Sequence, residues 1–287
     1  MGPVLRFPNF GIEFMKWSSG FSIFGFEIKY YGVIIAIAIL AGYLVADREA
    51  KRTGQSKELY MDFLLIVIIT SIIGARLYYV VLEWDDFKND IWQIFNIRSG
   101  GLAIYGGIIA AIITLYIFVK IKKQNFWVMA DTASLGLVTG QIIGRWANFM
   151  NLEAFGGYTN SIFAMQIRAD QAYYIPEGLL DKMVTYSGAE YLQVHPTFLY
   201  ESLWNVGVLI ILLVYKKHKK FKGEVFLLYM LGYALGRLWI EGMRTDQLII
   251  GSTGIPMSQL LAGVIAIASF GFVAYKRIML RKQGAHK

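Results

Sequence analysis

The sequence contains no cysteine, and its 287 residues include only five prolines and three histidines. Without cysteine the chain has no disulfide bond, no thiolate metal ligand and no thiol nucleophile of its own. The three histidines, His195, His218 and His286, are too widely spaced for a local metal-binding motif. Charged residues make up 17% of the chain, against about 25% in soluble domains. The start of the chain lacks a basic segment followed by an apolar run, so no cleavable signal peptide is expected.

Hydrophobic residues account for 56% of the chain and gather in long runs. Several runs approach the roughly 20 residues that an α-helix needs to cross a bilayer. The sequence therefore predicts an all-α integral membrane protein, with residues 1–287 forming a single polytopic domain of about seven transmembrane helices. The expected spans are 21–46, 59–82, 100–119, 128–147, 196–215, 224–243 and 255–275.

The net charge is +8, and the basic residues are spread unevenly among the loops. Most lysines and arginines lie in alternate loops, at 48–57, 120–123, 216–222 and 276–287. The positive-inside rule places these loops in the cytoplasm, with the N-terminus outside the membrane and the C-terminus inside. The basic loops thus need no nucleic-acid partner, although they would attract anionic membrane lipids.

Two polar segments lie outside the expected spans. Residues 1–20 mix aromatic and polar side chains, a pattern that fits either a segment on the membrane surface or an ordinary N-terminal arm. Residues 148–194 separate spans four and five and are expected to form an extracytoplasmic head segment.

The fourth span ends in GRWANFMNLEAFGG, residues 144–157. Arg145, Asn148, Asn151 and Glu153 follow an apolar run in which each charge costs roughly 2.5–3.5 kcal/mol on insertion scales. A single arginine there can extend its charged end to the headgroups. An arginine, two amides and a carboxylate within nine residues instead indicate a functional site.

The sixth span carries a second polar set, Arg237, Glu241 and Arg244, in GRLWIEGMR. Arg237 and Glu241 are four residues apart and share a helix face, which on its own fits a simple pair whose charges neutralise each other. Together with Arg145 and Glu153, however, the set counts three arginines against two glutamates. This excess predicts a positively charged pocket for an anionic headgroup, since arginine forks match phosphate oxygens.

Three further residues are candidates for the site. Tyr31 and Tyr105 each precede glycine and can point a hydroxyl into a pocket, although tyrosines are also common at membrane interfaces. His195 is the only histidine on the expected outer side and opens HPTFLYES, where Glu201 falls about one turn inside the fifth span. It is a candidate base or substrate ligand, or a structural residue.

At these residues the chain resembles the prolipoprotein diacylglyceryl transferase family. GRWANFMNLEAFGG resembles the family signature, and GARLYYV, SGGLAIYGG, HPTFLYES and GRLWIEGMR match further family blocks in the same order. The resemblance covers nearly the whole chain. It implies transfer of diacylglyceryl from phosphatidylglycerol to the lipobox cysteine in the signal peptide of a preprolipoprotein, with no metal or organic cofactor. It also implies that the membrane is the bacterial plasma membrane.

The resemblance also carries over a set of site residues: Tyr31, Arg145, Asn148, Glu153, Gly156, Arg237, Glu241 and Arg244. Some members have a histidine before the Gly-Gly of the third span, where this chain has Tyr105. A role for that histidine as general base therefore cannot be transferred to this chain.

The chemistry suggests roles for these residues. A phosphate ester must leave carbon, and positioned arginines stabilise its charge, so Arg145 and Arg237 are expected to bind the phosphate. Glu153 and Glu241 would orient the arginines, and Tyr105 would share in proton transfer or hydrogen bonding. Arg145 has no acidic residue one helical turn away, so we expect it to be the less neutralised cation.

Two other classes of protein fit the same pattern. A lipid or anion transporter also combines glycine-interrupted spans with buried charges, but no inverted repeat is visible here. A receptor-like or structural membrane protein would leave the polar residues unexplained.

Overall fold

The computed structural model describes residues 2–56, 58–97, 100–251 and 253–285. Contacts divide the chain into two compact units, one formed by Met1–Gly42 with Ser134–Lys287 and the other by Tyr43–Ala133. Helices α1 (Tyr30–Arg52) and α5 (Phe126–Met150) each contribute residues to both units. A single membrane domain over the whole chain stays a prediction.

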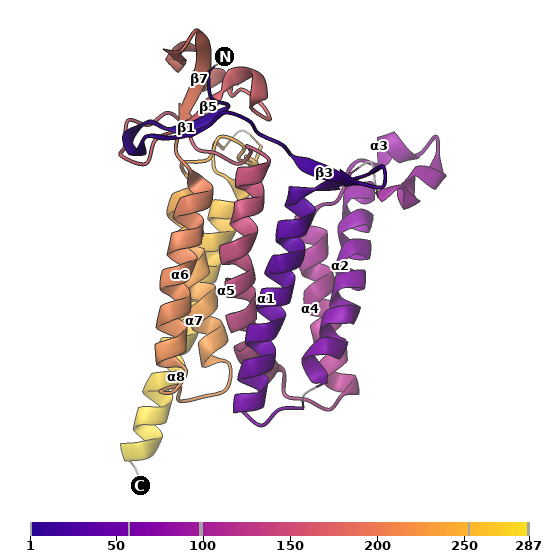
Figure 1. Ribbon diagram of the computed structural model, residues 1–287. Helices are drawn as coiled ribbons and strands as arrows, with labels where there is room; N and C mark the ends of the chain where they lie inside the picture. The colour runs from indigo at the N-terminus through magenta and orange to yellow at the C-terminus, as the bar shows by residue number, and fades with distance from the viewer. Residues whose placement is uncertain (1, 57, 98–99, 252, 286–287) are drawn as a thin grey trace. The chain divides into compact units, whose positions relative to one another are not determined.

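The first unit contains a group of long helices, α6 (Thr197–Tyr215), α7 (Glu224–Glu241) and α8 (Met257–Ala285), together with most of α5. In Figure 1 these helices run side by side, with α7 packed against both α6 and α8. Their sequences are apolar over most of their length, which is the condition for a helix to lie in hydrocarbon.

The second unit is built on the pairing of α2 (Leu59–Leu82) with α4 (Ile104–Ile121). Gly74 and Gly106 face each other at the contact, and a Cβ on Gly74 would lie 2.7 Å from the Gly106 carbonyl oxygen. Glycine is therefore required for the two backbones to approach this closely. A short helix α3 (Trp84–Phe87) and a 3₁₀ helix η2 (Ile91–Phe95) belong to the loop that joins α2 to α4.

Six of the described helices, all the long ones except α7, are long and apolar enough to cross a membrane. The chain is thus a mostly helical, multi-pass membrane protein, as the sequence predicts, whereas the count of seven spans stays a prediction. Most predicted boundaries lie within a few residues of the helices, and the second span, 59–82, coincides with α2. The first span was wrong at its start, because residues 20–29 form a β-hairpin and α1 begins at Tyr30.

The expectation of an all-α fold is corrected by two antiparallel sheets in the first unit. A five-stranded sheet has the order β2-β1-β5-β7-β6. Its strands are β1 (Leu5–Phe7), β2 (Ile12–Phe14), β5 (Met165–Arg168), β6 (Val184–Tyr186) and β7 (Ala189–Val194). The second sheet is the hairpin of β3 (Gly20–Ile23) and β4 (Phe26–Lys29). Short 3₁₀ helices are η1 (Pro8–Phe10), η4 (Ala169–Gln171) and η5 (Glu177–Lys182).

The larger sheet joins the N-terminal segment to the segment at 148–194. β1 pairs with β5, with Leu5 opposite Ile167, and β5 pairs in turn with β7. Residues 5–14 are therefore part of a folded sheet and not an unpaired arm. A position of this segment on the membrane surface stays a prediction.

A hydrophobic core fixes this sheet to the helices. Leu5, Ile167 and Leu192 from the strands pack in one buried cluster with Phe155 and Phe198. The rings of Phe149, at the end of α5, and Phe198, at the start of α6, lie 4.5 Å apart beside it. In Figure 1 the sheet accordingly lies at the ends of α5 and α6. Arg145 and Asn148 belong to the last turns of α5.

Candidate functional site

Three arginines converge on one carboxylate, that of Glu201 on α6. Its Oε2 lies 2.6 Å from Nη2 of Arg145 on α5. Its Oε1 lies 3.5 Å from Nη1 of Arg237 on α7 and 3.7 Å from Nη1 of Arg244, just beyond α7. The Glu201 side chain is only 7% exposed. A buried carboxylate is stable as an anion when charged partners surround it, so Glu201 holds the guanidinium groups of three chain segments together.

A second carboxylate, that of Glu241, supports the same group of side chains. Glu241 follows Arg237 by four residues on α7, and Arg237 Nη2 lies 2.6 Å from Glu241 Oε2, as the helical spacing predicts. Among the described residues no donor forms a hydrogen bond to the buried Oε2, so this contact is an ion pair without hydrogen-bond geometry. The other oxygen accepts a hydrogen bond from the hydroxyl of Ser258 on α8. Glu241 therefore links Arg237 on α7 to Ser258 on α8.

Arg244 forms a two-pronged pair with Asp246, in which Nε and Nη2 of Arg244 lie 2.9 Å and 2.7 Å from the two carboxylate oxygens. Burial acts to raise the pKa of Asp246, but the hydrogen bond and charge of Arg244 outweigh it and hold that pKa below its ordinary value. Burial likewise acts to lower the pKa of Arg244, and the pairing with Asp246 raises it overall. Both groups are therefore charged at neutral pH.

These contacts correct one expectation about charge. The cluster is not a plain excess of arginine, because Glu201, Glu241 and Asp246 face Arg145, Arg237 and Arg244. The error arose because only neighbours in sequence were counted. Among the described residues Arg145 forms an ion pair with Glu201, whereas Arg237 forms ion pairs with both Glu201 and Glu241. That Arg145 is the less neutralised cation of the two stays a prediction.

The loop that follows α5, residues 151–157, is called the signature loop. Its Glu153 carboxylate accepts hydrogen bonds from two amide side chains. Asn148 donates a hydrogen bond of 2.9 Å to Glu153 Oε1, and Asn151 donates one of 3.4 Å to Oε2. The residues on either side, Leu152 and Ala154, have positive φ angles of 52° and 56°. L-residues with side chains adopt this region at a cost, and such strain is concentrated at functional sites. In the described structure Glu153 thus bonds to the two amides, and its expected role in orienting an arginine is not seen.

Gly156 lies where three segments of backbone cross. Its N–H donates to the His195 carbonyl at 2.9 Å, and it forms an isolated bridge with Arg244. A Cβ at this position would lie 2.8 Å from the Cβ of His195 and 2.9 Å from the Met243 carbonyl oxygen. Only glycine fits, so Gly156 joins the signature loop to the start of α6 and the end of α7.

His195 acts at this crossing mainly through its backbone. Its ring Nδ1 lies 3.3 Å from the Tyr200 hydroxyl, and burial lowers the pKa of the ring. The imidazole is therefore neutral near pH 7 and can accept a proton. Its assignment as a substrate ligand stays a prediction.

A cavity of about 290 Å³ opens beside these residues. Its lining includes three predicted site residues, Asn148, Glu153 and Arg244. Tyr173, Tyr174 and Asp246 complete the polar part of the wall, and sequence reasoning missed them. Tyr174 is hydrogen-bonded to Thr245, and its ring stacks on Phe155 at 5.1 Å. Tyr31 is half-buried at the start of α1, close enough for the charges of Glu153 and Arg145 to act on its hydroxyl.

Two notable side chains belong to the second unit. Tyr105 is half-buried in the first turn of α4, and its role stays a prediction. Arg76 is buried in α2 and donates to backbone carbonyls of the α2–α4 loop, those of Gln93, Ile94, Asn96, Gly100 and Gly101. Arg76 thus has a structural role that explains an arginine within an apolar helix.

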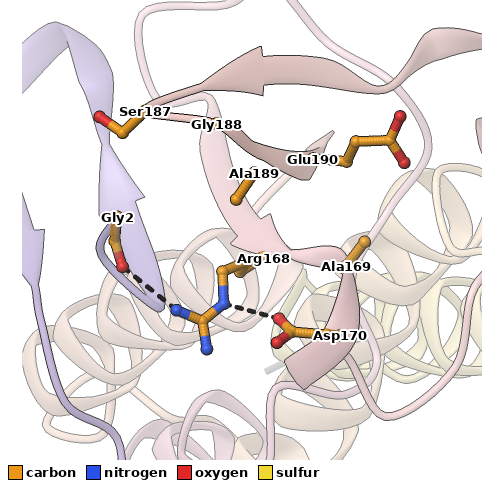
Figure 2. Close-up of a pocket in the computed structure, with 8 residues that line it drawn as sticks. All are labelled: Gly2, Arg168, Ala169, Asp170, Ser187, Gly188, Ala189 and Glu190. Carbon is orange, nitrogen blue, oxygen red and sulfur yellow. Dashed lines mark hydrogen bonds and ion pairs between the residues drawn. The ribbon is translucent and has the colours of Figure 1, made fainter.

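A larger cavity, of about 400 Å³, lies in the five-stranded sheet region and contains none of the predicted site residues. Figure 2 shows its only arginine, Arg168, bonded to the Asp170 carboxylate and the Gly2 carbonyl, at 2.6 Å and 3.2 Å. This arginine fixes the N-terminal segment to β5.

Among the described residues, no group of three or more histidine, aspartate or glutamate side chains is placed to hold a metal ion.

Comparison with known proteins bears directly on this arrangement. A family model described as prolipoprotein diacylglyceryl transferase matches residues 19–275. The chain is 43% identical over 254 residues to the phosphatidylglycerol–prolipoprotein diacylglyceryl transferase of Listeria innocua, covering 88% of this chain and 87% of the relative. It is 42% identical over 245 residues to the enzyme of the same name from Clostridioides difficile, covering 85% and 90%. The matched region contains every arginine and carboxylate of the cluster around Glu201, and the chain belongs to the prolipoprotein diacylglyceryl transferase family.

Proposed function

We propose that this chain transfers the diacylglyceryl group of phosphatidylglycerol to the lipobox cysteine of a preprolipoprotein, the step that begins lipoprotein maturation. The bond between the diacylglyceryl carbon and the phosphate oxygen breaks, and a carbon–sulfur bond forms. The thiol loses its proton, and glycerol phosphate leaves with the bonding electron pair. The chain has no cysteine, so the sulfur comes from the substrate protein.

The observation that carries the proposal is the convergence of Arg145, Arg237 and Arg244 on Glu201 in a chain of this family. The leaving phosphate gains negative charge as its ester bond breaks. Guanidinium groups that are already positioned stabilise that charge without reorganising at the moment of reaction. Arg145 and Arg237 bind the phosphate, and Glu201 keeps the like-charged groups at a fixed spacing until the lipid enters.

The polar cavity beside the cluster receives the rest of the headgroup. Asn148, Glu153 and Arg244 line it, and amide, carboxylate and guanidinium groups are suitable partners for glycerol hydroxyls and phosphate oxygens. Gly156 contributes by holding this wall together, and Glu241 by orienting Arg237. These roles also account for the residues that the family resemblance carries over, with the exception of Tyr31.

The thiol must be deprotonated before it attacks, since the thiolate is the nucleophile. Tyr31, Tyr105 and His195 are the candidates for proton transfer or for hydrogen bonding to the reacting groups. If Tyr105 transfers the proton, Tyr105→Phe lowers turnover by about 10²- to 10⁴-fold. Tyr116→Phe, on an exposed face of the same helix, is the control. Full activity in Tyr105→Phe would remove Tyr105 from the mechanism.

The direct test combines the purified chain with phosphatidylglycerol vesicles and a lipobox peptide. Transfer adds one diacylglyceryl group to the peptide, which mass spectrometry detects, and releases glycerol phosphate in equal amount. A peptide with serine in place of the cysteine, and an Arg145→Gln enzyme, should give no product. An unmodified peptide, together with movement of labelled lipid or anion across the vesicle membrane, would identify a transporter instead.

The topology that suits this reaction has seven spans in the bacterial plasma membrane, in which α7 crosses the membrane together with the six long apolar helices. The N-terminus and residues 148–194 face outward and the C-terminus faces the cytoplasm, so that the site meets exported preprolipoproteins. Because the chain lacks cysteine, single cysteines report on each side. A membrane-impermeant thiol reagent should label Asp181→Cys in intact cells, and Gln124→Cys only after permeabilisation. The reverse pattern would overturn the orientation.

A further inference from the structure

The hairpin formed by β3 and β4 separates apolar from polar side chains completely. Its register pairs Phe21 with Ile28, Ser22 with Glu27, and Ile23 with Phe26. Opposed residues in an antiparallel pair point to the same face, and successive residues alternate between faces. One face therefore carries Phe21, Ile23, Phe26 and Ile28, and the other carries Ser22, Glu27 and Lys29.

Within the part of the chain that the structure describes, the apolar face is largely uncovered. Phe26 is 70% exposed and Ile23 is 45% exposed. An isolated two-stranded hairpin is marginally stable in water, and its apolar face normally packs on another layer. On the polar face, Lys29 and Glu27 form an ion pair, so that face is suited to water. The hairpin thus has one side built for water and one for an apolar partner.

The turn at the tip of the hairpin also presents an apolar side chain outward. Ile23 and Phe26 are joined by Phe24 and Gly25, both with positive φ, at 49° and 82°. A two-residue turn of this kind favours Asn, Asp or Gly at its first position, and a bulky residue there is strained. Phe24 occupies that position and is 98% exposed. The strained turn therefore projects an aromatic ring directly away from the protein.

The hairpin is continuous with a membrane helix. Lys29 ends β4 and Tyr30 begins α1, which is long and apolar enough to cross a bilayer. The Phe21 ring packs against the Tyr30 ring with 5.5 Å between centroids, so the apolar face runs into the first turn of α1. In Figure 1 β3 accordingly lies at the end of α1. The end of a transmembrane helix lies at the headgroup level, where aromatic side chains are enriched.

We propose that the β3–β4 hairpin inserts its apolar face and the Phe24 ring into the leaflet in which α1 begins, at the boundary between headgroups and acyl chains. The occupant of this surface is bilayer lipid. Ser22, Glu27 and Lys29 remain on the aqueous side, and the hairpin holds the N-terminal end of α1, including Tyr31, at a fixed depth. This inference depends on α1 being a membrane span and does not depend on the transferase reaction.

The absence of cysteine makes the test specific. Nitroxide labels on Ile23→Cys and on Ser22→Cys lie on opposite faces of one strand and leave Phe24 in place. The full chain is reconstituted in vesicles of phosphatidylcholine and phosphatidylglycerol. Collisions with oxygen, which concentrates in lipid, are compared with collisions with a water-soluble nickel chelate. We expect the oxygen-to-nickel ratio to be several-fold higher at position 23 than at position 22.

Phe24→Asn gives an independent measurement. Asparagine suits the turn's positive φ, so this variant removes the ring while relieving the backbone strain. With it, the ratio at position 23 should fall toward that at position 22, whereas Phe24→Trp should preserve the difference. Equal ratios at positions 22 and 23 in the otherwise unchanged chain would overturn the proposal. So would label–label broadening that rises with protein density, which identifies a second copy, or protection that appears only when a lipobox peptide is added.

Discussion

Glu201 Oε2 lies 2.6 Å from Arg145 Nη2, and this contact joins α5 to α6 across 56 positions of sequence. The same carboxylate faces Arg237 and Arg244, so its removal leaves three guanidinium groups close together without their common counter-charge. Breaking a buried ion pair by removing one partner costs about 3–5 kcal/mol. We expect Glu201→Gln to lower the thermal unfolding temperature clearly and to abolish most transfer. The measurement is Tm in detergent together with lipidation rate.

Asp62→Asn is the matched control for Glu201→Gln. Asp62 forms an ion pair with Lys122 at 2.7 Å, but both side chains are more than 40% exposed. Exposed pairs contribute little to stability, so this variant should retain the parent Tm. An unchanged Tm in Glu201→Gln would show that the arginines find other partners and that Glu201 is not their common support.

Replacing Arg145 with lysine tests whether phosphate binding needs the two parallel N–H donors of a guanidinium group. Lysine keeps the positive charge but loses the planar pair of donors that matches phosphate oxygens. Loss of a charge-assisted hydrogen bond costs about 1.5–3 kcal/mol, which corresponds to about 10- to 150-fold in transfer rate. Arg168→Lys alters a comparably buried arginine in the five-stranded sheet and should leave the rate within a few-fold. Near-parental rates in Arg145→Lys would mean that charge alone suffices at this position.

The crossing at Gly156 gives a prediction with a neighbouring control. A Cβ there would meet His195, Met243 and Thr197, whereas a Cβ on Gly157 would meet nothing within 4 Å. Overpacking of this kind costs about 1–3 kcal/mol. Gly156→Ala should therefore reduce both Tm and lipidation, and Gly157→Ala should reduce neither. Equal behaviour of the two variants would show that the three segments separate easily and do not need the close approach.

His195 predicts a specific pH dependence of stability. Burial lowers its pKa below the ordinary 6.5, so between the two values the unfolded chain binds a proton that the folded chain does not. The free energy of unfolding should therefore rise with pH through the range just below 6.5 and become flat above it. His195→Gln should remove this rise, and His218→Gln controls for the loss of a histidine elsewhere. Tm measured from pH 5 to 8 tests the prediction, which fails if His195→Gln keeps the slope.

The long helices could be predicted from the sequence because each one contains a long apolar run, although their ends were less certain, as the start of α1 shows. The strands were missed because a search for long apolar runs does not detect the alternation of apolar and polar residues that marks a strand. LRF, IEF, FEIK and MQIR all alternate apolar and polar residues, which is the pattern of a half-buried strand. A search at that period would have found most of both sheets. It would not have found the pairing of β1 with β5, because residues 5 and 167 meet only in the folded chain.

The candidate site divides in the same way. The i, i+4 pair of Arg237 and Glu241 follows from helix geometry and appears in the structure. Glu201 could be placed within its helix, but nothing in the sequence indicated which face meets α5 or α7. Gly156 was selected by family resemblance, and the structure supplies the physical reason, which is the space needed by three crossing backbones. Local geometry was thus predictable, and contacts between distant segments were not.

The contact between Arg145 and Glu201 also constrains how the chain is assembled in the membrane. During synthesis α5 emerges before α6, so Arg145 reaches the bilayer while Glu201 has not yet been made. An arginine within hydrocarbon costs roughly 2.5–3.5 kcal/mol on insertion scales, and its long side chain avoids this by staying at the headgroups. The end of α5 is therefore expected to remain at the membrane boundary until α6 is inserted beside it. The end of α5 thus packs in its final position only after Glu201 on α6 is present. The order of translation therefore determines the order in which the helices of this bundle pack together.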